Sequence, residues 1–145
     1  MTRNAPPVEV HNEIVIQASA ELVWDLLADV SHWPAWWRAC RWVRVESAGD
    51  AVPPASFRWK AHPVELRSTV VAARRPHSFA IVADAPGVHA HRTFSLSAAP
   101  GGAGTAVVSH ETQVGWLPWL GRAVLAPRLE AVNQAMFADL ARAAR

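Results

Sequence analysis

The sequence lacks most of the features that would place it in a familiar class. It contains one cysteine, Cys40, so neither an internal disulfide nor a cysteine metal cluster can form. Lys60 is the single lysine among 14 basic residues, and the arginines are scattered. They form no basic stripe interleaved with stacking aromatics, which argues against nucleic-acid binding. No Gly-x-Ser-x-Gly elbow, phosphate loop, dinucleotide motif or metal-ligand spacing is present, so we expect no cofactor and no metal.

Long apolar runs are also missing. Every such run is broken by charge or proline before the ~20 residues that a membrane span needs, so we expect no stable membrane insertion. Residues 1–7 lack the apolar centre of a signal peptide and are expected to be a flexible leader in a cytoplasmic protein. The remaining residues, 8–145, have the length and composition of a single globular domain. The sequence leaves the oligomeric state open between monomer and dimer.

Tryptophan, in contrast, is abundant. Four of the eight tryptophans lie between Trp24 and Trp37. An indole favours burial while its N–H needs a partner, so such a group closes a core or lines a site for an apolar ligand. We expect Trp24 to pack on a helix face, and the others to lie where a cavity entrance forms. A second pair, Trp116 and Trp119, either closes one end of a cavity or forms an exposed patch for a membrane or partner, and we favour closure.

Periodicity predicts an α+β chain. Residues 8–16 alternate as a strand, Ser19 caps a helix, and Pro34 should end it near 31–33, before a second short helix at 35–39. Six period-two segments follow, at 42–46, 57–60, 64–73, 78–83, 88–97 and 105–114. Short turns between them favour antiparallel neighbours. A long C-terminal helix then carries an apolar stripe formed by Leu125, Leu129, Val132, Met136 and Leu140.

The same order of elements resembles a known superfamily. The segment 14–29, the step Trp33-Pro34-Ala35-Trp36, Arg75-Pro76, and the glycine-rich turn at 101–105 together resemble the START-like (Bet v 1-like, SRPBCC) superfamily and its polyketide cyclase/dehydrase group. The resemblance implies a helix-grip fold, in which a curved antiparallel sheet of about seven strands wraps around the C-terminal helix. It also implies a cavity between them, since relatives bind lipids, sterols, quinones or aromatic polyketides. Fold alone does not fix function.

Strand alternation and the resemblance together suggest a set of ligand-binding residues on the inner face of the sheet, the entrance and the helix. The set is Trp33, Trp36, Trp37, Trp59, Leu66, Ser68, Ile81, Arg92, Phe94, His110, Thr112, Leu129, Val132 and Met136.

Arg92 and His110 are the candidate polar pair within this set. If the hairpin pairs Leu96 with about Ala106, Arg92 falls roughly opposite His110 and both point toward the helix. In the alternative interpretation, one or both lie at the open edge of the sheet, in solvent or paired with Glu111. A register slip of one residue would turn both side chains outward. Two functions follow. The first is binding or transport of a small hydrophobic molecule, and the alternative is a cyclase or dehydratase with His110 as acid/base and Arg92 polarising a carbonyl.

Overall fold

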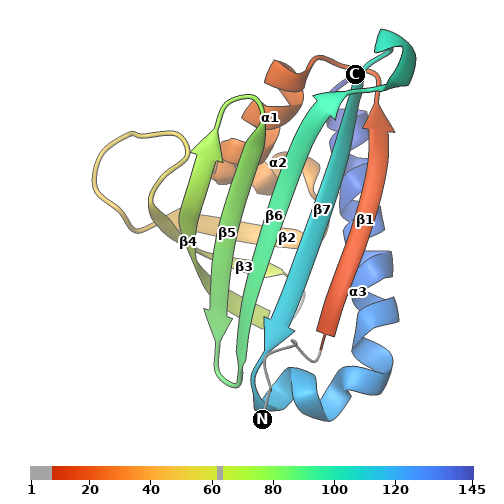
Figure 1. Cartoon of the computed structure of the whole chain (residues 1–145). Helices are drawn as coiled ribbons and strands as arrows, with labels where there is room; N and C mark the ends of the chain where they lie inside the picture. Colours follow the sequence, from red (N-terminus) through yellow and green to blue (C-terminus); the bar gives the residue numbers. More distant parts are fainter. Residues whose placement is uncertain (1–7, 62–63) are drawn as a thin grey trace.

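A seven-stranded antiparallel sheet forms the body of the protein. The computed structural model describes residues 8–61 and 64–145, so the predicted leader at 1–7 lies outside the described residues. The strands lie in the order β1-β7-β6-β5-β4-β3-β2 (Figure 1). Their bounds are β1 Val8–Ile16, β2 Cys40–Val45, β3 Ser56–Ala61, β4 Val64–Arg74, β5 Ser78–Ala85, β6 Val88–Ala98 and β7 Thr105–Val114. The predicted strands and the curved antiparallel sheet are confirmed.

Three short helical segments connect β1 to β2. They are α1 (Ala20–Ala28), the 3-10 turn η1 (Val30–His32) and α2 (Trp33–Trp36). Ser19 caps α1 as predicted, because its Oγ accepts from the Leu22 amide at 3.1 Å. The predicted break near 31–33 is displaced, because α1 ends at Ala28 and the second helix, predicted at 35–39, begins at Trp33. Pro34 disfavours helical angles at the residue before it. Trp33 keeps helical angles while its buried ring donates from Nε1 to the Leu27 carbonyl at 3.0 Å, so tertiary packing overrides the local preference.

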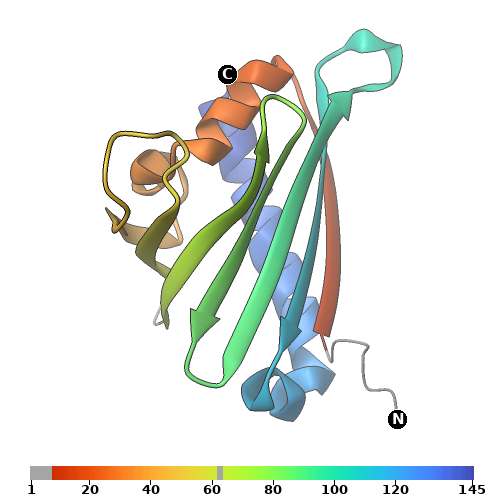
Figure 2. The same ribbon diagram turned by 60° about the vertical axis from the view of Figure 1, so that its left-hand side comes forward.

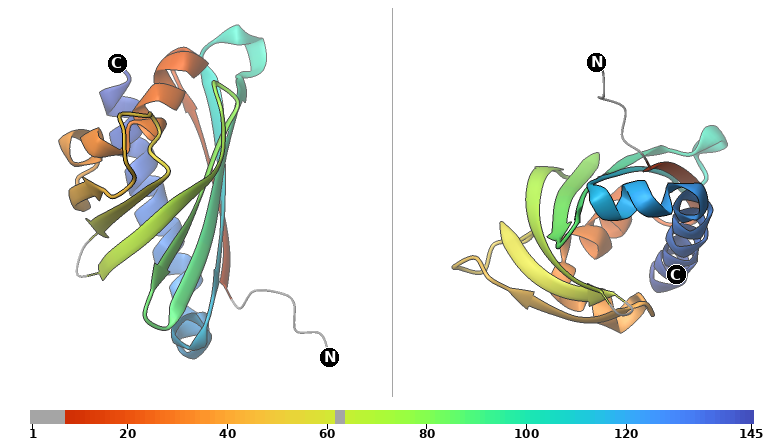
Figure 3. Two further views of the ribbon diagram at one scale, coloured as in Figure 1. Left: turned by 90° about the vertical axis from the view of Figure 1, so that its left-hand side faces the viewer. Right: turned by 90° about the horizontal axis from the view of Figure 1, so that it is seen from below.

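The long helix α3 (Trp116–Ala143) lies along β1, the strand at one edge of the sheet (Figure 2). Asn12 of β1 donates to the Glu130 carbonyl at 3.1 Å and to Gln134 Oε1 at 3.0 Å, which fixes the helix against that strand. The end-on view in Figure 3 shows the sheet curving around the side on which the helices lie. No helix in the described ranges is long and apolar enough to cross a membrane.

The predicted helix stripe is correct only in its C-terminal half. Met136 and Leu140 are buried, whereas Leu125 and Leu129 are half-buried and Val132 is exposed. An α-helix has 3.6 residues per turn, so positions three or four residues apart do not stay on one side of a long helix. The buried side of α3 therefore also includes Asn133 and Phe137.

An aromatic cluster around Trp33 forms the core between α2 and the β2–β3 end of the sheet. The Trp33 ring centroid lies 5.3 Å from Trp37, 5.4 Å from Phe57 and 5.3 Å from Trp59. All three contacts are edge-on, the arrangement that aromatic rings favour. Four of the predicted site positions were expected near an entrance or inner wall, yet Trp33, Trp37 and Trp59 are buried in this cluster and only Trp36 is half-exposed. The tryptophan-rich segment is therefore mainly core.

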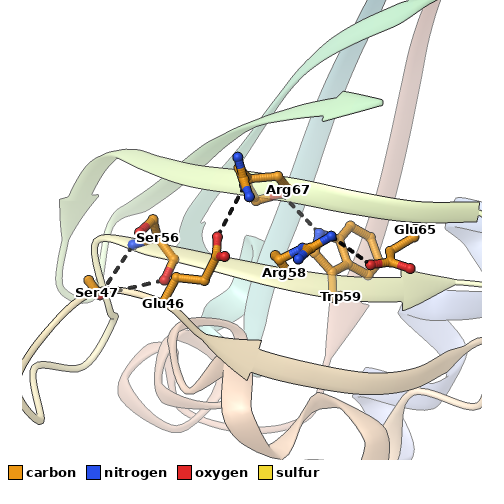
Figure 4. Close-up of polar contacts among 8 residues, drawn as sticks. Glu46, Ser47, Ser56, Arg58, Trp59, Glu65 and Arg67 are labelled. Carbon is orange, nitrogen blue, oxygen red and sulfur yellow. Dashed lines mark hydrogen bonds and ion pairs between the residues drawn. The ribbon is translucent and has the colours of Figure 1, made fainter. Parts of the chain in front are cut away.

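Charged and polar contacts hold β2, β3 and β4 together (Figure 4). Arg58 of β3 pairs with Glu65 of β4 at 2.9 Å, and Arg67 of β4 pairs with Glu46 at 3.1 Å. The Oγ of Ser47 accepts from the amide of Ser56 at 3.3 Å. Exposed pairs of this kind each add little stability, but they favour one strand register.

Candidate functional site

The inner face of the sheet is set by the register of its central strands. In the β6–β7 pair, Arg92 lies opposite Glu111 and Phe94 opposite Ser109. Burial follows the same alternation, with Arg92, Phe94 and Leu96 buried on β6 and Val107, Ser109 and Glu111 buried on β7. Ile81 of β5 lies beside Arg92 on the other side. The inner face therefore consists of apolar side chains around a small polar centre.

The predicted pairing of Arg92 with His110 is wrong by one residue. Leu96 pairs with Val107, not Ala106, so His110 and Thr112 fall on the outer face. His110 Nε2 instead lies 2.9 Å from the Glu9 carboxylate, in a partly exposed pair. Because side chains alternate along a strand, a slip of one residue moves every β7 side chain to the other face. The hairpin closes on the Ala98–Thr105 pair, and that closure sets the register.

Arg92 is the most unusual side chain of the site. It is buried, with 9% of its surface exposed, and its guanidinium carbon lies 4.5 Å from the Phe94 ring centroid. In the described structure its Nη2 donates to Ser109 Oγ at 3.3 Å, and its buried Nε has no hydrogen-bond partner. A buried donor without a protein partner costs free energy, so this N–H can take an acceptor from a bound molecule.

Glu111 supplies the opposing charge. Its Oε1 accepts from Asn133 Nδ2 of α3 at 2.8 Å, and its Oε2 accepts from Gln113 Nε2 at 2.9 Å. The carboxylate is thus held by two amides, one of which ties the sheet to α3. Sequence reasoning named Glu111 only as an outer-face partner of His110 and did not place Ser109, Gln113 or Asn133 in the site. The register alone brings them to Arg92.

The charge of Arg92 is sensitive to this arrangement. Burial lowers the pKa of the Arg92 guanidinium, and the nearby Glu111 carboxylate opposes that shift. Arginine stays protonated in proteins, so this shift means that burial destabilises the positive charge of Arg92. The nearby Glu111 carboxylate offsets part of that cost. The pair makes the polar centre close to neutral overall.

The remaining predicted residues divide between core and margin. Ser68 is fully buried and its Oγ accepts a hydrogen bond from Trp59 Nε1 at 2.9 Å, so this hydroxyl already has one partner within the protein. Ile81, Phe94 and Met136 are buried on the inner side of the core. Leu66 and Leu129 stay half-buried, as do Val88 and Ala90, inner-face positions of β6 near the β5–β6 turn. The inner face is therefore least covered at that end.

The structure also shows two surface depressions away from Arg92 and Glu111. One of about 460 Å³ is lined by Gln17, Ala18, Ser19, Ala20, Ala98, Gly102, Gly104 and Thr105. The other, of about 290 Å³, is lined by Glu13, Ile14, Val15, Ala106, Val107 and Val108. Neither contains a predicted ligand-binding residue. The expected cavity between sheet and helix thus stays a prediction.

The prediction that Trp116 and Trp119 close a cavity is wrong. Both belong to the first turn of α3 and are more than half exposed. The helix begins directly after β7, so its first turn extends past the end of the sheet and projects these rings outward.

Cys40 is a buried, free cysteine at the start of β2. Burial raises the pKa of the Cys40 thiol to about 12, so it stays protonated near neutral pH. We therefore expect the native protein to resist a thiol reagent such as 5,5′-dithiobis(2-nitrobenzoic acid) at pH 8 and to react fully in 6 M guanidinium. Stoichiometric reaction of the native protein within minutes would contradict this burial.

Comparison with known proteins supports the same architecture. The family described as polyketide cyclase / dehydrase and lipid transport matches residues 7–145. A hypothetical protein of Helicobacter pylori has a similar structure, with a TM-score of 0.82, 14% identity, and coverage of 100% of this chain and 99% of its own. A START superfamily protein of Mycobacterium smegmatis gives a TM-score of 0.70 at 16% identity, covering 93% and 92%.

A third similar structure is the di-domain ARO/CYC StfQ from the steffimycin biosynthetic pathway. Its TM-score is 0.74 at 15% identity, over 94% of this chain and 50% of that one. No curated protein sequence matches this chain. At these identities the similar structures establish the fold and not the ligand.

Proposed function

Because the chain belongs to the polyketide cyclase / dehydrase and lipid transport family, we propose that it binds a small hydrophobic molecule on the inner face of the sheet. In this proposal the ligand lies against the inner apolar residues and accepts a hydrogen bond from Arg92. The ligand is a lipid, sterol, quinone or aromatic polyketide. Such sites combine an apolar wall with a few polar groups that orient the ligand.

The buried Nε of Arg92 carries the proposal. It has no partner in the described structure, although it lies among Ile81, Phe94 and Ser109 in the interior. A ligand oxygen at this point would satisfy the donor and remove the cost of leaving it unpaired. The half-buried ends of β4 and β6 support an approach from the end of the sheet near the β5–β6 turn.

The charge of the site favours a neutral oxygen over an anion. Glu111 lies opposite Arg92 and already balances its charge, so a ligand carboxylate would meet an acidic neighbour. A carbonyl or hydroxyl oxygen accepts the Nε–H without adding charge to the interior. The proposed ligand is therefore apolar apart from one or a few neutral oxygens.

A matched pair of ligands tests this directly. We expect 2-acetylnaphthalene to bind more tightly than 2-ethylnaphthalene, which has the same shape without the oxygen, as measured by quenching of tryptophan emission. Hydrogen bonds to charged groups contribute about 1.5–3 kcal/mol, which corresponds to a preference of roughly 10- to 150-fold.

The matched variant removes both charges together. In Arg92→Leu/Glu111→Leu the preference should fall sharply, because the charged Nε donor of Arg92 is removed, while Arg44→Leu, at an exposed arginine, should keep it. Equal affinity of the two ligands for the unaltered protein would refute a role for Arg92. Absence of quenching by either ligand, and by a panel of sterols, quinones and fatty acids, would refute binding at this face.

The alternative of a cyclase or dehydratase needs an acid/base beside Arg92. The sequence assigned that task to His110, which faces outward and pairs with Glu9. Glu111 is the carboxylate beside Arg92, but its two oxygens already accept from the Asn133 and Gln113 amides. We therefore propose binding alone.

A further inference from the structure

The first half of α3 carries an apolar face that the fold leaves uncovered. Trp116, Leu120 and Val124 follow one another at intervals of four residues and therefore lie along one line of the helix. They are 62%, 66% and 62% exposed. Leu117 and Trp119 flank them and are also exposed. We call these five residues the outer α3 face.

This face is separate from the one that packs the helix. Pro118 is buried and Leu125 and Leu129 are half-buried, and these three residues lie on the opposite side of the helix. The first half of α3 is therefore apolar both toward the sheet and toward solvent. A helix with apolar residues on both sides usually covers its second face with another surface.

The position of the face is fixed by the neighbouring turn. The Leu117 amide donates to the Gly87 carbonyl at 3.0 Å, and the Trp116 indole lies directly against Gly87. Figures 1 and 2 show the start of α3 beside the β5–β6 turn, at the end of the molecule away from α1. The outer α3 face is therefore held in place at the end where the inner face of the sheet is least covered.

The charge around the face indicates its partner. Residues 115–129 include Arg122 and Arg128 and no acidic residue. The Arg122 guanidinium carbon lies 4.0 Å from the Trp119 ring centroid, and Arg122 Nη1 donates to the Trp119 carbonyl. The neighbouring turn carries one acid, Asp84, which already pairs with His89 at 2.5 Å. Exposed tryptophan and leucine beside arginine, without acidic residues, are the features of helices that lie in a membrane interface.

We propose that the outer α3 face docks on a lipid surface with anionic headgroups. Trp116, Leu120 and Val124 enter the boundary between headgroups and acyl chains, while Arg128 and the Arg122 guanidinium, which lies against Trp119, meet the phosphates at the margins of the face. A second copy of the chain fits less well. Two copies packed along this stretch would bring arginines together without an acid from residues 115–129 to pair with them. This docking does not depend on whether Arg92 binds a ligand.

Vesicle flotation tests the proposal on the full chain. We expect the protein to float with vesicles of phosphatidylcholine containing 30% phosphatidylglycerol, and to float less with pure phosphatidylcholine. The exposed-site variant Leu120→Ser/Val124→Ser should partition at least roughly tenfold more weakly, because it removes two large apolar side chains from the contact. Arg122→Gln/Arg128→Gln should lose the preference for the anionic vesicles and the sensitivity to salt.

The matched control is Val15→Ser/Val71→Ser, which changes two exposed valines on β1 and β4. It should float like the unaltered protein. Equal flotation of the two serine double variants would overturn the proposal, as would flotation that ignores phosphatidylglycerol. A stable dimer by light scattering that becomes a monomer in Leu120→Ser/Val124→Ser would overturn it in favour of a second copy.

Discussion

Replacing Glu111 with leucine should lower the free energy of unfolding by about 3–5 kcal/mol, because it leaves the buried Arg92 charge without its counter-charge. The change also removes the acceptor of the Asn133 and Gln113 amides, which are 2.8 and 2.9 Å from the carboxylate. Urea denaturation followed by circular dichroism measures the loss.

A double-mutant cycle separates the charge from the packing. Arg92→Leu/Glu111→Leu should recover much of the stability lost in Glu111→Leu, since no charge then remains buried at this point. If the double variant is as unstable as the sum of the two single variants, the charges act independently and the paired site is wrong. His110→Leu, on the outer face, should change stability by less than about 1 kcal/mol.

Replacing Trp33 with alanine should cost about 3–5 kcal/mol, the range for large aromatic residues in a core. Trp33 is 1% exposed and contacts three aromatic rings at once, so its loss leaves a cavity between α2, β2 and β3. Its Nε1 also anchors the chain to the Leu27 carbonyl at the end of α1. The expected readout is a lower urea midpoint with an unchanged slope.

A graded pair of variants checks the cause. Trp33→Phe keeps part of the ring contact and should cost clearly less than Trp33→Ala. Trp42→Ala, at a half-buried position on β2, should cost less than either because its ring lies outside the Trp33 cluster. A Trp33→Ala variant as stable as Trp42→Ala would mean that the cluster is a binding surface and not a core.

The fold was predictable because several independent patterns agree along the chain. The alternation of β1 and the Ser19 cap gave the first strand and helix, and the order of motifs gave the helix-grip family, which the family match confirms. The exposure of Trp116 and Trp119 at the start of α3 was not predictable. The sequence does not show whether the sheet extends far enough to cover them.

The site was predictable in part, since Arg92 and Phe94 stand out on β6. Their partners depend on the β7 register, and Ala106, Val107 and Val108 are all apolar, so the sequence does not show which side of β7 faces inward. Hairpin geometry decides between the two faces, and the loop 99–104 is too long for a fixed turn rule. Because of this ambiguity, the sequence predicts His110 opposite Arg92, where the structure has Glu111.

The pairing of β1 with β7 has a consequence for how the chain folds. Val8 lies opposite Gln113 and Ile16 opposite Thr105, so β1 has no strand partner until residues 105–114 have been synthesised. Bringing such distant segments together has a large entropic cost before their contacts form. This cost slows folding to the range of about milliseconds to seconds. During synthesis on the ribosome, β1 is an unpaired edge that waits for β7, and the nascent chain is most exposed to aggregation in that interval.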